Sequence, residues 1–305
     1  MRKLKHYLEY MGVKFLSWLI ALLSLNHARA LGRLLGRLTF SVFRIRRNVT
    51  LTNLKHAFPE KIATELFEIA AKTYEHFGMV MVEFLRVLAL PQNAAYEAII
   101  NVKNNTILEA AHKAGKGAIC LTAHFGNWEY AGGWLAYRGY PMVVMVQEQS
   151  NPYVDKMFRL CRKRMGMHTI PRGTAMRSYL KALKAGEYAV MLADQDAGQD
   201  GVFVDFFGKK ASTAAGPARF HLKTGAPILM FMTYRDDDGQ LNMEIEKLSL
   251  PQGTNDKEKA LLEIMQAYHH CIEKWIRRYP HHWFWMHKRW KTQPQKQTSE
   301  TRETA

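Results

Sequence analysis

The residues best suited to chemistry in this sequence are a histidine and a glutamate five positions apart, His124 and Glu129. On one helix, five steps of about 100° would place the two side chains about 140° apart around the axis. They can meet only if His124 lies outside the helix, on a turn. A carboxylate beside an imidazole fixes its tautomer and stabilises the imidazolium formed on proton uptake. The spacing predicts a His-Glu general-base pair; the alternative is a strand-end histidine near a surface glutamate.

The residues around this pair predict a strand, a turn and a helix. Residues 118–123 are a short, mostly apolar run without charge, which suits an interior strand of an α/β sheet. Gly126 permits a sharp turn, and Asn127 is a good N-cap. Glu129 then falls in the first turn of the helix. His124 is expected at the carboxyl end of the strand, where open α/β sheets place their ligands.

Strands and helices alternate along most of the remaining chain. The predicted strands are 141–146, 168–171, 188–193, 227–234 and 241–250, the last two joined by a turn at 236–239. The predicted helices are 60–90, 106–112, 152–165, 174–186, one within 211–223, and 256–278, with a glycine-interrupted loop at 198–208. Strands separated by helices predict one α/β domain with a largely parallel central sheet flanked by helices.

Polar side chains follow several of these predicted strands. Arg172 and Gly173 follow the strand 168–171, and Asp194 and Asp196 follow the strand 188–193. Because the carboxyl ends of parallel strands lie at one edge of a sheet, we expect these groups to converge with His124. A histidine base, a cation for a phosphate and acceptors for hydroxyl groups suit the transfer of a group onto an alcohol. For Arg172, an ordinary surface arginine is the alternative.

The charge and the N-terminal residues indicate anionic partners. The formal net charge is +16, with 43 Lys and Arg against 27 Asp and Glu, which fits nucleic acid, an anionic membrane or an acidic protein. An uncharged run at 15–25 is too short to span a bilayer, and 31–38 alternates leucine with arginine at helical spacing. We therefore predict an N-terminal membrane-anchoring helix. A cleaved signal peptide and a buried core helix are the alternatives.

These patterns divide the chain into three parts. Residues 1–45 form the predicted anchor and basic amphipathic helix, 46–292 the α/β domain, and 293–305 a polar tail that we expect to be disordered. The three cysteines are far apart and show no disulfide or zinc spacing, which fits a reducing compartment. Cys120 lies near His124 in sequence and is either a thiol nucleophile or a small core residue.

Five segments of the sequence are motifs that occur together in one known family. They are 123–129 (Ala-His-Phe-Gly-Asn-Trp-Glu), 170–173 (Ile-Pro-Arg-Gly), 192–196 (Leu-Ala-Asp-Gln-Asp), 206–227 with its Phe-Phe-Gly and Gly-Pro-Ala-Arg, and 283–290 (Trp-Phe-Trp-Met-His-Lys-Arg-Trp). In this combination they resemble the bacterial lipid A biosynthesis (late) acyltransferases, within the lysophospholipid and glycerol-phosphate acyltransferase superfamily. The match covers nearly the whole chain.

The resemblance implies transfer of a fatty acyl chain from acyl carrier protein, or acyl-CoA, to a hydroxyl of a lipid A precursor. It places the enzyme at the cytoplasmic face of the bacterial inner membrane. His124 would deprotonate the hydroxyl, which attacks the thioester directly without a covalent enzyme intermediate, and Glu129 would orient His124. We expect no metal or other cofactor because a thioester is already activated, and no nucleic acid partner.

The resemblance also suggests residues that bind the substrates. Arg172 would hold a phosphate, Asp194 would contact a sugar or hydroxyl, and backbone amides near the site, including the Phe207–Gly208 turn, would stabilise the oxyanion. The full set of expected substrate-binding residues is Asn127, Arg172, Gly173, Asp194, Asp196, Gly208 and Arg219.

Two other interpretations stay open at this point. An acyltransferase of the same fold could act on another glycolipid or on a lysophospholipid. A non-catalytic, basic, membrane-peripheral lipid- or nucleic-acid-binding protein would explain the charge without any use for His124 and Glu129.

Overall fold

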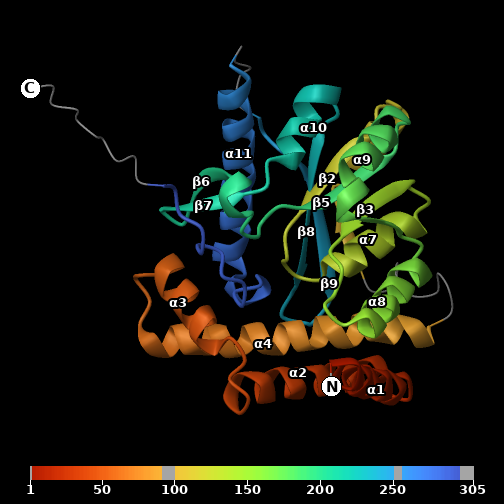
Figure 1. The fold of residues 1–305 in the computed structure, drawn as a ribbon, viewed down its shortest axis with the longest axis vertical. Coiled ribbons are helices and arrows are strands. Elements are labelled where there is room, and N and C mark those ends of the chain that lie inside the picture. Colours follow the sequence, from red (N-terminus) through yellow and green to blue (C-terminus); the bar gives the residue numbers. More distant parts are fainter. Residues whose placement is uncertain (1, 91–99, 251–255, 296–305) are drawn as a thin grey trace, which may run out of the picture.

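The computed structural model describes residues 2–90, 100–250 and 256–295 (Figure 1). The α-helices are α1 (Arg2–Ala21), α2 (Leu25–Ser41), α3 (Arg47–Ala57), α4 (Ala63–Arg86), α6 (Asn105–Lys113), α7 (Trp128–Tyr137), α8 (Pro152–Arg164), α9 (Ala175–Lys184), α10 (Gly216–Thr224) and α11 (Lys257–Arg278). Short 3₁₀ turns are η1 (Val87–Ala89), η2 (Arg172–Thr174), η3 (Gly198–Asp200) and η4 (Pro280–His282). The strands are β1 (Ile100–Lys103), β2 (Ala118–Thr122), β3 (Met142–Val146), β4 (His168–Pro171), β5 (Tyr188–Leu192), β6 (Val202–Phe206), β7 (Lys209–Thr213), β8 (Ile228–Arg235) and β9 (Leu241–Lys247).

The central sheet has seven strands in the order β1-β9-β8-β2-β5-β3-β4. All neighbouring pairs are parallel except β8 and β9, which form the antiparallel hairpin predicted around 236–239. The prediction of a largely parallel α/β sheet is confirmed. Strand β2 is buried at every position because helices cover both faces of the sheet. This burial agrees with its uncharged sequence.

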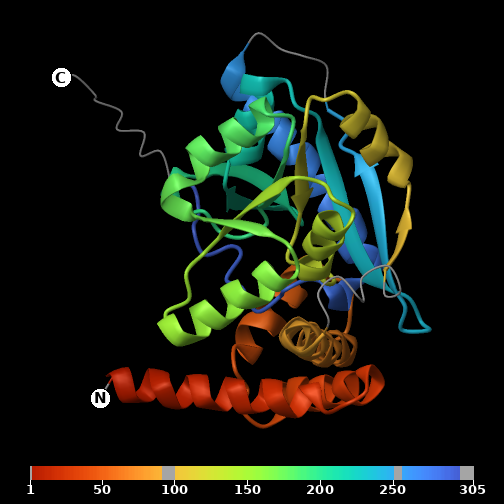
Figure 2. The same ribbon diagram turned by 90° about the vertical axis from the view of Figure 1, so that its right-hand side faces the viewer.

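Each face of the sheet has its own hydrophobic core. Side chains of α9, α10 and α11 pack on one face, and side chains of α6, α7 and α8 pack on the other. Helix α4 runs across one end of the sheet, and α1 and α2 lie beyond it (Figures 1 and 2). The end that α4 covers is the carboxyl edge, because the His76 side chain of α4 contacts the carbonyl of Gly126, just after β2.

The β6–β7 hairpin lies outside the central sheet. Its first strand, β6, falls in the segment 198–208 that was predicted to be a loop, so that prediction is wrong there. The two turn residues of the hairpin, Phe207 and Gly208, both have positive φ, 51° and 70°. Phenylalanine is rarely found in this conformation, so the usual Asn-Gly or Asp-Gly hairpin signal is missing from the sequence. Packing overrides the local preference, because the Phe207 ring contacts the rings of Phe58 and Trp285.

Helices α2 and α4 cross with their backbones in close contact. A Cβ atom added at Gly36 would lie 2.1 Å from the carbonyl oxygen of Tyr74, and one at Gly32 would lie 2.7 Å from that of Gly78. Only glycine allows this approach. The contact ties the N-terminal part of the chain to the helix that covers the carboxyl edge of the sheet.

None of the helices in the described part of the chain combines the length and the apolar composition needed to cross a membrane. Helix α2 is buried along one side, at Ala28, Gly32, Gly36 and Phe40, and α1 buries Ser17 and Ile20. Many other apolar side chains of α1 and α2 are exposed. Of the predicted polar tail, 296–305 lie outside the described residues.

We predict that Gly36→Ala destabilises the protein by about 1–3 kcal/mol, because the added methyl group forces the α2 and α4 backbones apart. Gly12→Ala in α1 is the matched control, since a Cβ atom there meets nothing within 4 Å. Denaturant unfolding of both variants measures the difference. Equal stability of the two variants would show that the α2–α4 contact is not tight.

Candidate active site

His124 and Asp194 each follow the carboxyl end of a strand, and the two strands, β2 and β5, are neighbours that end at the same position along the sheet. Strands β2 and β5 pair in register up to Thr122 and Leu192, and each of the two polar residues lies two positions further on. His124 Nδ1 is 2.8 Å from Asp194 Oδ1, and the backbone N–H of His124 donates to Oδ2 at 2.9 Å. The expected convergence at the carboxyl edge is therefore found for these two residues.

Asp194 is buried, with 1% of its surface exposed, and its carboxylate accepts a third hydrogen bond, from Trp283 Nε1 at 2.9 Å. Burial would raise the pKa of Asp194, but the His124 imidazole and the N–H donors of His124 and Trp283 lower it to about 2. An ionised carboxylate can only accept hydrogen bonds. His124 Nδ1 must therefore carry the proton, which leaves Nε2 free to act as a base.

Glu129 does not pair with His124, which corrects the sequence-based expectation. Its carboxylate accepts hydrogen bonds from Arg162 of α8, from Nε at 3.0 Å and 3.2 Å to its two oxygens and from Nη2 at 2.6 Å. His124 is outside the helix, as the spacing argument requires. The carboxylate that the imidazole meets is not the predicted Glu129 but Asp194, which follows the neighbouring strand β5. Glu129 instead fixes the start of α7 against α8.

The turn after His124 is held on several sides. Gly126 has a φ of 59°, and a Cβ atom there would lie 1.9 Å from the carbonyl oxygen of Thr233, so only glycine fits. The Gly126 N–H donates to the carbonyl of His282 at 2.9 Å, and the Phe284 N–H donates to the carbonyl of His124 at 3.0 Å. The chain after α11 thus lies directly against the turn that carries the base.

Two aromatic side chains lie beside the imidazole. The ring centroid of His124 is 5.1 Å from that of Trp128 and 6.4 Å from that of Phe284. Phe77 of α4 contacts both of these rings, at 5.9 and 5.1 Å. A quarter of the His124 side chain is exposed. The base therefore faces solvent beside an apolar wall that suits an aliphatic substrate.

The segment 283–290 was predicted only as one of the five family motifs, with no role assigned to its individual residues. In the structure Trp283 and Trp285 are almost fully buried. Arg289 is also buried and donates hydrogen bonds to the Ser212 carbonyl and to Thr213 Oγ1 of β7. Sequence reasoning missed that Trp283 holds Asp194. The density of tryptophan in 283–290 was the available signal, but it does not identify the partner.

Arg172 and Gly173 lie in η2, directly after β4. Arg172 is exposed, and β4 is separated from β2 by β5 and β3. Three strand spacings place Arg172 about 14 Å along the edge from His124. Arg172 is therefore at the predicted edge, but far enough from the imidazole that it can hold only a distant part of a substrate.

Four other predicted binding residues are not placed at the His124 imidazole. Asn127 is fully buried, so it is a structural residue, and its prediction as the N-cap of α7 is confirmed by a hydrogen bond from the Tyr130 N–H. Asp196 accepts hydrogen bonds from the N–H and hydroxyl of Thr292. Arg219 is exposed on α10, at the end of the sheet opposite α4 (Figure 1).

The fourth is Gly208, together with the turn amides expected to stabilise an oxyanion. Gly208 is exposed at the tip of the β6–β7 hairpin, and the Phe207 N–H already donates to Glu273. That amide is therefore not a free oxyanion donor. Cys120 is buried, and burial raises the pKa of its thiol, so the core interpretation holds and a nucleophilic role is disfavoured.

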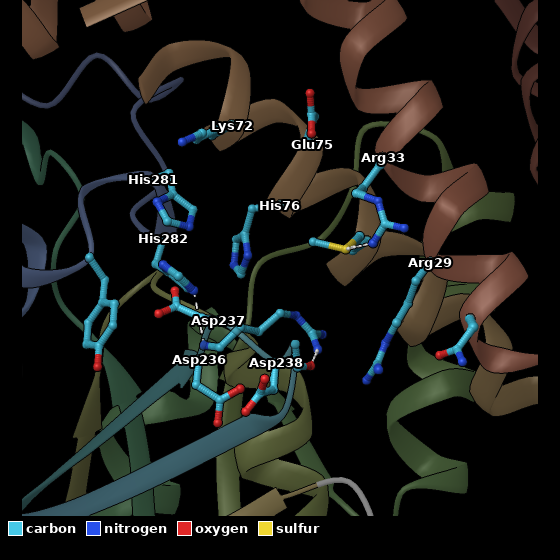
Figure 3. A pocket seen from close by; sticks show the side chains of 15 residues that line it. Arg29, Arg33, Lys72, Glu75, His76, Asp236, Asp237, Asp238, His281 and His282 are labelled. Atoms are coloured by element: carbon cyan, nitrogen blue, oxygen red, sulfur yellow. Dashed lines mark hydrogen bonds between the residues drawn. The ribbon is translucent and has the colours of Figure 1, made fainter. Parts of the chain in front are cut away.

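The turn from His124 to Asn127 is called the catalytic turn below. A cavity of about 380 Å³ lies behind it, between α2, α4, η4 and the β8–β9 turn. Figure 3 shows His281 and His282 across the cavity from Arg29 and Arg33. His76 and His282 line it and also contact Gly126, whereas His124 does not line it. Among the described residues, no group of three or more His, Cys, Asp or Glu side chains is placed to hold a metal ion.

A His-Asp pair at the carboxyl edge of an α/β sheet, beside aromatic side chains, provides a candidate general base for activating a hydroxyl group. The chain belongs to the bacterial lipid A biosynthesis acyltransferase family, whose model matches residues 1–292. It is therefore an O-acyltransferase.

Three relatives illustrate the family. A lipid A biosynthesis acyltransferase of Haemophilus influenzae is 25% identical over 273 residues, which is 85% of this chain and 83% of the relative. A lipid A biosynthesis lauroyltransferase of Escherichia coli is 26% identical over 298 residues, 95% of this chain and 94% of the relative. A phosphatidylinositol mannoside acyltransferase of Mycolicibacterium smegmatis is 26% identical over 187 residues, 60% of each chain.

We predict that Asp194→Asn lowers kcat by about 1,000-fold. The amide oxygen will take the position that accepts two N–H bonds, so the NH₂ group faces His124 Nδ1 and forces the proton onto Nε2. The base is then blocked. Steady-state acyl transfer measures the loss, with Asp196→Asn as the neighbouring control, expected to lose less than about tenfold. Similar losses in both variants would exclude a specific role for Asp194.

Proposed function

We propose that the enzyme transfers a fatty acyl chain from the thioester of acyl carrier protein to a hydroxyl of a lipid A precursor. The observation that carries the mechanism is the His124–Asp194 pair, in which Nδ1 is bound to a buried carboxylate and Nε2 has no hydrogen-bond partner among the described residues. The lipid A relatives, matched over most of their length, support the acceptor.

In the proposed reaction, Nε2 of His124 accepts the proton of the acceptor hydroxyl as its oxygen attacks the thioester carbon. The tetrahedral intermediate collapses with cleavage of the C–S bond, and the imidazolium returns the proton to the leaving thiolate. Asp194 stabilises the imidazolium, because its low pKa keeps it ionised throughout. No covalent enzyme intermediate is needed.

Other groups would hold the substrates in place. The rings of Phe77, Trp128 and Phe284 would line the path of the acyl chain next to the thioester. Arg172, about 14 Å along the sheet edge, would bind a phosphate of the acceptor or of the donor's phosphopantetheine arm. Glu129 would affect His124 only indirectly, because its bonds to Arg162 fix the start of α7.

The reaction is tested by incubating the protein with acyl carrier protein charged with a fatty acid and a lipid A precursor in vesicles. Mass spectrometry should show the acceptor heavier by one acyl chain, and His124→Ala should abolish this product. A parallel reaction with acyl-CoA identifies the donor. An unimpaired His124→Ala enzyme would contradict the mechanism.

A second acceptor follows from one of the relatives. The phosphatidylinositol mannoside acyltransferase of M. smegmatis is 26% identical over 60% of each chain, so a mannosylated phosphoinositide is the alternative glycolipid acceptor. Offering both glycolipids to the same enzyme decides between them. A wild-type enzyme that is inactive on both, with both donors, would overturn the proposed acceptor class.

We further propose that α1 and α2 dock the enzyme on the cytoplasmic face of the inner membrane. Exposed apolar side chains are Leu8, Phe15 and Trp18 in α1, Leu22 directly after it, and Leu34 and Leu38 in α2. Both helices lie on the side of the molecule toward which the carboxyl edge of the sheet points (Figures 1 and 2). A glycolipid held in the membrane would thus approach the edge that carries His124.

We predict that the double substitution Phe15→Asp and Trp18→Asp weakens binding to phosphatidylglycerol vesicles by at least about tenfold, because two apolar side chains leave the interface and two negative charges enter it. Leu222→Asp on α10, at the opposite end of the molecule, is the control and should bind like wild type. Vesicle co-sedimentation measures the binding. Unchanged binding of the α1 variant would exclude this docking face.

A further inference from the structure

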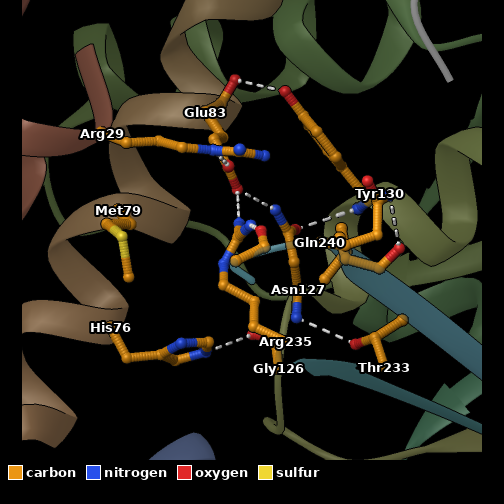
Figure 4. Close-up of polar contacts among 12 residues, drawn as sticks. Arg29, His76, Met79, Glu83, Gly126, Asn127, Tyr130, Thr233, Arg235 and Gln240 are labelled. Carbon is orange, nitrogen blue, oxygen red and sulfur yellow. Dashed lines mark hydrogen bonds and ion pairs between the residues drawn. The ribbon is translucent and has the colours of Figure 1, made fainter. Parts of the chain in front are cut away.

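Glu83 is a fully buried carboxylate near the end of α4 that joins four parts of the fold (Figure 4). Its Oε1 accepts from Arg29 Nε of α2 at 2.6 Å. Its Oε2 accepts from Arg235 of β8 and from Asn127 Nδ2 at 2.8 Å. Asn127 is the residue at which the catalytic turn ends and α7 begins.

A buried charge network of this kind is weak evidence for stability. Removing three charged groups from water costs free energy that their mutual attraction often only offsets, and apolar side chains of the same volume can serve as well. What the network does supply is directional contact between elements. Glu83 is therefore best understood through what its carboxylate holds in place.

Glu83 binds the Asn127 side-chain amide directly, and both the nitrogen and the oxygen of that amide form hydrogen bonds. Nδ2 donates to Glu83, and Oδ1 accepts from the Tyr130 N–H at 3.1 Å. The Asn127 N–H donates to Thr233 Oγ1 at 2.9 Å. The Tyr130 hydroxyl also donates to the backbone carbonyl of Glu83, at 3.1 Å. The first turn of α7 is thus fastened to α4 at two points.

Asn127 is three residues after His124, so its position sets where the catalytic turn ends. The turn begins where the His124 N–H meets Asp194, and its middle is held at Gly126 by His76 and His282. Glu83 completes this set of restraints at the far end. A shift of the turn would move His124 Nε2 relative to a bound thioester, and misplacement by about 1 Å can cost about 100-fold in rate.

We propose that Glu83 is a positioning residue for acyl transfer: through Asn127 it fixes the turn that carries His124, and through Arg29 it ties that turn to α2. This inference rests on the proposed role of His124 as the base. Arg29 lies on the same helix as Leu34 and Leu38, so the network connects the proposed docking helix to the catalytic turn.

The chain contains its own control for this inference. Arg37 and Glu75 form a second ion pair between α2 and α4, with Nη2 2.7 Å from Oε1. Two thirds of the Arg37 side chain is exposed, whereas Arg29 and Glu83 are largely or fully buried. The Arg37–Glu75 pair joins the same two helices, and in the described part of the chain neither side chain bonds to residues 124–127. Loss of either pair loosens α2 from α4, but only loss of Glu83 releases Asn127.

The test compares Glu83→Gln, Asn127→Ser and Glu75→Gln in the full-length enzyme. Asn127→Ser guards against failure to fold, because serine keeps an N-cap oxygen and leaves the Arg29–Glu83–Arg235 ion pairs intact. We expect kcat to fall by about 100-fold in Glu83→Gln and by at least about tenfold in Asn127→Ser, with KM within about threefold of wild type. Glu75→Gln should keep both constants.

A readout that needs no turnover separates this inference from the proposed function. Hydrogen exchange of the backbone amides of 124–130 should be faster in Glu83→Gln and Asn127→Ser than in wild type and Glu75→Gln. Faster exchange with a lower kcat at constant KM supports the positioning role. Unchanged kcat and unchanged exchange in folded Asn127→Ser would overturn it. A wild type that exchanges slowly at 124–130 but transfers no acyl chain would refute the proposed function instead.

Discussion

The hydrogen bond between His124 Nδ1 and Asp194 is the interaction on which the site depends, and it follows from the register of two adjacent strands. Strands β2 and β5 pair up to Thr122 and Leu192, so the residues two positions later leave the sheet side by side. A slip of one residue would turn His124 and Asp194 to opposite faces. The parallel core of the sheet therefore determines the catalytic geometry.

The rest of the fold holds this pair in place. The segment after α11 closes over the turn, with Trp283 bound to Asp194 and Phe284 bound to the carbonyl of His124. Helix α4 covers the same edge and contributes His76, Phe77 and Glu83 to the turn or to its surroundings. Helix α4, from the N-terminal part of the chain, and the segment after α11, from its C-terminal part, thus meet at the turn that carries His124.

Much of this could be predicted from the sequence, where local signals are strong. The apolar run of β2, the Gly126 turn and the Asn127 cap were read correctly, because each depends on residues next to it. The predicted partner of His124 was wrong because it depends on residues that are distant in the sequence. Glu129 was predicted as the partner and Asp194 only as a contact for a sugar or hydroxyl, and the strand order, a long-range property, brings Asp194 to the imidazole and Arg162 to Glu129. The role of Trp283 was missed because a tryptophan more than 80 residues from its partner leaves no pattern in a single sequence.

The proposed mechanism treats His124 and Asp194 as one unit, and a double-mutant cycle tests this most directly. Single-turnover acyl transfer would be measured for wild type, His124→Ala, Asp194→Asn and the variant carrying both substitutions. If the two residues act together, the double variant should be no slower than His124→Ala, within about threefold. A double variant slowed by the product of the two single effects would show that they act independently and would contradict the mechanism.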